Sequence, residues 1–153
     1  MPTALSCFKA YDIRGRVPLE LNLELARQIG LAFAAEFAPK TVCIGRDARL
    51  SSKDISLVLA NGLEDGGAEV VDIGLCGTEE IYHATFSQGF AGGIMITASH
   101  NPADWNGMKL VRAGAVPVSA DSGLAAIRER ILAGDLTVAS KRGYTRSQSF
   151  RAE

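Results

Sequence analysis

One segment of the chain, Gly93-Ile94-Met95-Ile96-Thr97-Ala98-Ser99-His100-Asn101-Pro102, joins an apolar run to a serine in an Asn-Pro turn. The apolar run suits a buried strand. Pro102 disfavours helix at the residue before it, so Ser99 is expected on a tight loop that reaches solvent. Loops held by rigid strands commonly carry binding and catalytic residues. The segment therefore predicts a hydroxyl group presented at the end of a strand.

The residues around this segment alternate between strand and helix patterns. Apolar strand runs are expected at residues 41–44, 68–73, 93–97 and 108–112. Helices are expected from Asn22 to Pro39, from Ser51 or Ser52 to Gly66, from Thr78 to Gly89, and from Asp121 or Ser122 to Leu132. Alternation of this kind with continuous apolar strands indicates an α/β fold. We expect a mixed, mostly parallel four-stranded sheet with helices on both faces.

The loops that follow the parallel strands should meet at one edge of the sheet. Ligands of open α/β sheets bind outside the carboxyl ends of the strands. Arg46 and Arg49 follow one strand and Ser99 follows another, so the three side chains are expected to converge. Asp47, between the two arginines, is expected to hold its own loop through ion pairs, so this segment is interpreted as a scaffold.

A serine hydrolase is disfavoured by the residues beside Ser99. His100 is a poor base for its neighbour, because consecutive side chains of an extended segment point in opposite directions. The flanking Thr97 and Asn101 do not form the Gly-x-Ser-x-Gly turn of the α/β-hydrolases. Acyl transfer remains an alternative that labelling of Ser99 by a fluorophosphonate would support.

Composition indicates an ordinary globular protein. The chain has 153 residues, 47% of them hydrophobic, and a formal net charge of −1, which gives no electrostatic support to nucleic-acid binding. No membrane span or secretory signal is expected, and a cytoplasmic location is the default. Three widely spaced cysteines, Cys7, Cys43 and Cys76, make a disulfide framework or a zinc site improbable.

Four ordered motifs resemble those of the alpha-D-phosphohexomutases, enzymes that move a phosphoryl group between the 1- and 6-positions of a hexose. The motifs are Phe8-Lys9-Ala10-Tyr11-Asp12-Ile13-Arg14-Gly15, Gly45-Arg46-Asp47-Ala48-Arg49-Leu50-Ser51-Ser52, Thr97-Ala98-Ser99-His100-Asn101-Pro102 and Asn106-Gly107-Met108-Lys109. Together they extend over most of the chain, which is far more specific than any single short pattern.

The resemblance implies a mechanism and a set of site residues. Ser99 would carry the transferred phosphate, and a bisphosphorylated hexose would turn around between two transfers. Lys109 would be the general acid or base and would also bind substrate, and His100 would handle a proton or contact phosphate. Arg14 and Tyr11 would be an active-site pair that binds substrate, with Arg14 also catalytic through phosphate oxygens or by orienting the acid/base group. Magnesium is the implied cofactor, with a phosphoserine oxygen of Ser99 among its ligands. Mannose phosphates are the expected substrates, with glucose or glucosamine phosphates as alternatives.

The length implies an incomplete enzyme, because the family that the sequence resembles has four domains. We interpret residues 1–134 as the first of these and residues 135–153 as a linker toward missing domains. The chain alone is therefore expected to lack turnover. A fragment or module that binds sugar phosphates without catalysis remains the alternative.

Overall fold

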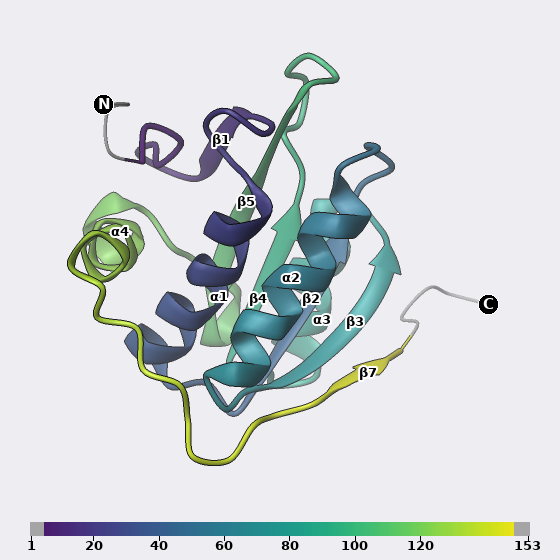
Figure 1. The fold of residues 1–153 in the computed structure, drawn as a ribbon. Helices are drawn as coiled ribbons and strands as arrows, with labels where there is room; N and C mark the ends of the chain where they lie inside the picture. The colour runs from purple at the N-terminus through teal and green to yellow at the C-terminus, as the bar shows by residue number, and fades with distance from the viewer. Residues whose placement is uncertain (1–4, 149–153) are drawn as a thin grey trace.

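The computed structural model describes residues 5–148, which form a mixed sheet of seven strands with helices on both faces (Figure 1). The strands are β1 (Ile13–Arg16), β2 (Thr41–Arg46), β3 (Glu69–Leu75), β4 (Gly92–Ile96), β5 (Trp105–Arg112), β6 (Val116–Pro117) and β7 (Thr145–Ser147). Their order is β1-β5-β4-β2-β3-β7, and β6 pairs with β5. Strands β4, β2, β3 and β7 are parallel, while β5 is antiparallel to both β1 and β4.

Helices cover the two faces unequally. The helices are α1 (Leu23–Phe37), α2 (Ser52–Asp65), α3 (Thr78–Ser87) and α4 (Leu124–Ala133). In Figure 1, α1 and α2 lie in front of the sheet, α4 lies beyond α1, and α3 lies behind the sheet. In the described part of the chain, no helix is long and apolar enough to cross a membrane.

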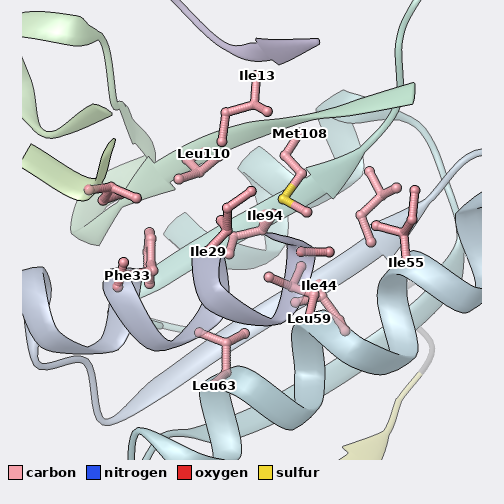
Figure 2. Close-up of a cluster of buried hydrophobic side chains, with 14 of the residues drawn as sticks. Ile13, Ile29, Phe33, Ile44, Ile55, Leu59, Leu63, Ile94, Met108 and Leu110 are labelled. Carbon is pink, nitrogen blue, oxygen red and sulfur yellow. The ribbon is translucent and has the colours of Figure 1, made fainter. Parts of the chain in front are cut away.

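The alternation of side chains along each strand divides the core into two clusters. Ile44 and Ile94 belong to the larger cluster with α1 and α2, whereas Cys43 and Met95 belong to the smaller one with α3. This is the period of two that a strand imposes. Figure 2 shows the larger cluster, where strand residues meet Ile29, Leu59 and other helix residues. Cys43 is fully buried in the smaller cluster, and burial raises the pKa of its thiol.

A residue signal in the sequence fixes the start of α1, whereas Ser51 precedes α2 without a side-chain capping hydrogen bond. The side chain of Asn22 accepts a hydrogen bond from the backbone N–H of Leu25 at 2.8 Å, as expected for an N-cap.

Helices α1 and α2 cross at two glycines. A Cβ on Gly30 would lie 2.6 Å from the carbonyl oxygen of Leu59, and one on Gly62 would lie 2.1 Å from that of Arg27. The absence of side chains at these positions lets the two backbones touch.

The sheet has seven strands, more than the four that the sequence predicts. The four expected strands are β2, β3, β4 and β5, and the sequence missed β1, β6 and β7. These three are short: β1 has the sequence Ile-Arg-Gly-Arg, β6 has two exposed residues, and all three residues of β7 are exposed. None carries an apolar run, so no local pattern predicts it. Each is held instead by backbone pairing to a longer neighbouring strand. The mixed α/β class itself is confirmed.

Part of the presumed linker packs against the domain. The residues from Ala139 to β7, here called the strap, follow the end of α2 and the edge of β3. Arg142 contacts Glu64 at 2.7 Å and Asp65 at 2.8 Å, and Arg146 contacts Glu69 at 3.0 Å. The backbone N–H of Gly143 donates to the carbonyl oxygen of Glu64. The domain boundary at residue 134 stays a prediction.

Acid should loosen the strap. Hydrogen bonds from Arg142 and Arg146 lower the pKa values of Asp65 and Glu69 respectively. A carboxylate with a lowered pKa in the folded state stabilises that state above its unfolded pKa, and this contribution is lost as the pH falls through the folded value. Below about pH 4, amide exchange at Ala139 and Gly143, corrected for intrinsic rate, should accelerate before the core does. The effect should be modest because the pairs are exposed. Equal protection of the strap and the core down to acid unfolding would contradict this.

Candidate active site

Ser99 lies on an exposed turn just beyond the carboxyl end of β4. Its φ angle is 56°, in the left-handed region that is uncommon for residues other than glycine. The backbone N–H of Ser99 donates to the hydroxyl oxygen of Thr97 at 3.0 Å, and the amide of Asn101 donates to the carbonyl oxygen of Ala98 at 2.7 Å. These short-range bonds form the turn expected from the Asn-Pro sequence. Strained backbone of this kind occurs often at functional sites.

Arg49 holds the loop that carries Ser99. Residues 97–105 are called the serine loop here. The guanidinium group of Arg49 donates to four backbone carbonyl oxygens of this loop: Ser99 at 2.9 Å, Asn101 at 2.8 Å, Pro102 at 2.6 Å and Trp105 at 3.0 Å. Its side chain is only 14% exposed. A single cation from the loop after β2 therefore joins both halves of the loop after β4.

Asp47 orients Arg49 from the same loop. One oxygen of Asp47 lies 3.3 Å from Nε of Arg49, and the other accepts bonds from the backbone N–H of Arg49 and the hydroxyl of Ser52. The backbone N–H of Asp47 donates to the carbonyl oxygen of Ile96, at the end of β4. This confirms that the segment from Gly45 to Ser52 is a scaffold in which Asp47 forms an ion pair.

A buried asparagine closes the other end of the serine loop. Asn106 is fully buried, and its amide donates to the hydroxyl oxygens of Ser51 at 2.8 Å and Ser52 at 2.9 Å. Its side-chain oxygen accepts a bond from the backbone N–H of Gly107. Both ends of the serine loop are thus tied to the start of α2.

Arg14 and Lys109 lie on one face of neighbouring strands. Arg14 pairs with Gly107, two residues before Lys109 on β5, and paired or alternate residues share a face. On the other side of β5, the carbonyl oxygen of Gly107 accepts a hydrogen bond from the backbone N–H of Thr97, at the start of the serine loop. Arg14 is therefore about 10 Å, two strand spacings, from the base of the serine loop. The side chain of Arg14 contacts Asp12 at 3.0 Å.

The predicted site residues fall into two groups. Ser99 and His100 are adjacent and exposed on the turn, while Arg14 and half-buried Lys109 lie on the strands beside it. Tyr11 is 81% exposed and lies in the turn between Lys9 and β1. Their functional roles stay predictions.

The described residues do not form a hydrolase dyad or a metal centre by themselves. Within residues 5–148, the hydroxyl of Ser99 makes no hydrogen bond to a histidine or carboxylate. The same residues contain no group of three or more His, Cys, Asp and Glu side chains that could hold a metal ion. A magnesium ion bound to a phosphate on Ser99 would therefore need its other protein ligands from elsewhere.

Sequence reasoning missed the reach of Arg49 and the role of Asn106. Arg49 was placed at the correct edge of the sheet, but its bonds span 50 to 56 residues of sequence. No local pattern encodes such contacts. The one available signal was the density of polar residues in two of the motifs, around Asp47 and before Gly107.

Comparisons with known proteins agree with this geometry. A family model described as "Phosphoglucomutase/phosphomannomutase, alpha/beta/alpha domain I" matches residues 6–137. The phosphomannomutase of Salmonella typhimurium is 54% identical over 97% of this chain, and the match covers 33% of that protein. Phosphohexose mutases of Xanthomonas campestris are 57% identical over 84% of this chain, which corresponds to 29% of their length. The chain thus spans about a third of these relatives.

A solved structure supports the same assignment. A phosphoglucomutase/phosphomannomutase family protein of Burkholderia thailandensis superposes with a TM-score of 0.85 at 35% identity, over 95% of this chain and 33% of its own. The similarity covers the whole sheet and its helices rather than one motif. The chain therefore belongs to the phosphoglucomutase/phosphomannomutase family and corresponds to its α/β/α domain I.

Proposed function

We propose that this chain is the phosphoserine domain of an enzyme that moves a phosphoryl group between the 1- and 6-positions of a hexose, with mannose phosphates as substrates. The observation that carries the proposal is the presentation of Ser99 on a rigidly held, exposed turn beside Arg14 and Lys109. Membership of the family supports the reaction class. The names of the relatives support mannose, with glucose and glucosamine phosphates as alternatives.

The reaction exchanges one phosphorus–oxygen bond for another in each step. A free hydroxyl of the sugar monophosphate attacks the phosphorus on Ser99, the bond to Oγ of Ser99 breaks, and a hexose bisphosphate forms. After the bisphosphate turns around, Oγ of Ser99 attacks the phosphate at the other position and releases the isomeric monophosphate. Transfer of this kind depends mainly on positioning and on charge neutralisation.

The strand residues beside the turn supply a proton acceptor and a cation. Lys109 takes the proton of the attacking hydroxyl and returns it in the second step. Arg14, on the same face, neutralises phosphate oxygens. His100 contacts phosphate from the turn, and Tyr11 contacts a more distant part of the substrate.

In this proposal a phosphate on Ser99 would offer an oxygen ligand to magnesium, a hard cation that prefers oxygen ligands and would supply further charge neutralisation. Residues 5–148 contain no group of three or more His, Cys, Asp and Glu side chains that could complete such a site, so its other ligands would come from elsewhere in the enzyme. The roles of Lys109 and Arg14 do not depend on where those ligands lie.

A chimera tests the proposal. This chain would replace the corresponding third of the Salmonella typhimurium phosphomannomutase. With mannose 1-phosphate, a trace of hexose bisphosphate and Mg²⁺, the chimera should turn over, and its mass should show one phosphoryl group localised to Ser99. The isolated chain should give no turnover, because its described residues contain no group of side chains that could complete the metal site.

Two results would reject the mutase assignment. A folded chimera that neither turns over nor carries phosphate at Ser99 would favour a non-catalytic module that binds sugar phosphates. Stoichiometric labelling of Ser99 by a fluorophosphonate probe would favour a serine hydrolase instead.

A further inference from the structure

The hydrogen bonds of Arg49 direct the carbonyl oxygens of the serine loop toward its interior. Four carbonyl oxygens of the loop point toward one guanidinium group, and a fifth, that of Ala98, accepts bonds from the backbone and side chain of Asn101. Carbonyl oxygens repel a phosphate dianion. Drawing them toward a cation inside the loop leaves the exposed surface of the loop, where Ser99 lies, with less negative potential.

We propose that Arg49 is a positioning residue for phosphoryl transfer, acting through the serine loop without touching substrate. This inference rests on the proposed function of Ser99. Arg49 fixes the left-handed backbone of Ser99 and supplies a positive charge beneath the phosphate. Asp47 fixes Arg49 in turn, and its hydrogen bond to Ser52 ties the pair to the start of α2.

The geometry requires a guanidinium group. Its planar array of N–H donors serves four acceptors through two terminal nitrogens while Nε faces Asp47. A lysine has a single nitrogen with three donors and cannot span from Ser99 to Trp105. A displacement of about 1 Å in a reacting group can reduce a rate about 100-fold. The identity of residue 49 should therefore affect the chemical step more than substrate binding.

The test uses Arg49→Gln and Arg49→Lys in the chimera described above. Arg49→Gln should lower kcat about 100-fold, with KM for mannose 1-phosphate changed less than about threefold. Arg49→Lys keeps the charge but loses most of the geometry, so it should lower kcat about 10-fold. Rapid mixing of the phosphorylated variants with sugar phosphate should show that loss of phosphate from Ser99 is the slowed step. Asp47→Asn should also lower kcat. The double variant Asp47→Asn with Arg49→Gln should lose less activity than the sum of the two single losses in free energy, because both residues act through the same contact.

Arg27→Lys is the matched control. Arg27 is also a partly buried arginine paired with an aspartate, at 2.8 Å from Asp65. Its partner is the last residue of α2, about 20 Å along the helix from the end that carries Ser52. The control should share any general loss of stability while kcat per folded molecule stays at the parent value.

The outcomes separate a positioning role from a structural one. A fall in kcat per folded molecule with KM preserved, graded from Lys to Gln, supports the inference. Parent-like kcat in both variants, or a loss that follows only the folded fraction measured by thermal melting, overturns it. A large rise in KM with kcat unchanged also overturns it, because it would place Arg49 on the substrate. If Ser99→Ala retained turnover, the proposed function would fail independently of any result at Arg49.

Discussion

Replacing Ser99 by alanine in the chimera is expected to lower kcat by about 10⁴-fold or more. In the proposed mechanism the variant removes the atom that exchanges phosphate with the sugar, so the two transfers would have no carrier. The backbone turn should persist, since alanine loses only the hydroxyl and the bonds from Arg49 reach backbone atoms. Steady-state turnover of mannose 1-phosphate and intact mass measure the two expected losses, those of rate and of bound phosphate.

Ser87→Ala provides the control for this experiment. Ser87 is the last residue of α3 and is exposed, so its replacement should leave both rate and phosphate content unchanged. Normal turnover by the Ser99→Ala chimera would show that another group carries the phosphate and would remove the basis of the proposed mechanism.

Phe33→Ala should produce the largest loss of stability among single core truncations. Phe33 is fully buried in the larger cluster, and its ring lies 5.0 Å from that of Phe37, centroid to centroid. The ring also fills the space over Gly92, where a Cβ would lie 2.8 Å from Cζ of Phe33. Truncation leaves a cavity between α1 and the sheet and should cost about 3–5 kcal/mol. Domains of this size are stabilised by about 5–15 kcal/mol, so the loss is a large fraction of the total.

Urea unfolding followed by circular dichroism gives the measurement. Phe86→Ala is the matched control, because Phe86 is 72% exposed on α3 and its truncation should change the free energy of unfolding by no more than about 0.5 kcal/mol. Similar midpoints for the two variants would mean that α1 packs less tightly on the sheet than the structure shows.

The elements that carry their own hydrophobic pattern were predictable from sequence. Leu25, Ile29 and Phe33 are spaced along one face of α1, and Asn22 begins that helix as its residue type suggests. The central strands carry apolar runs with both faces covered, so their existence and type followed from the pattern of the sequence. The exposed turn of Ser99 followed from the Asn-Pro pair after such a strand.

The rest depends on contacts between distant parts of the chain. Strand β1 exists because Ile13 and its neighbours pair with β5, almost 100 residues away in sequence. The bonds of Arg49 to the serine loop and those of Asn106 to Ser52 are of the same kind. Their energy depends on distance and angle in the folded state, and no local propensity reports it.

The direction of β7 has a practical consequence for anyone who attaches something to this domain. Because β7 runs parallel to β3, its polypeptide heads toward the edge of the sheet where β4 ends and Ser99 begins its turn. A fluorescent reporter, affinity handle or surface tether joined beyond this strand would be delivered to the side of the sheet that carries Ser99. Insertion into the turn from α2 to β3, at the opposite edge, would leave the side of Ser99 clear.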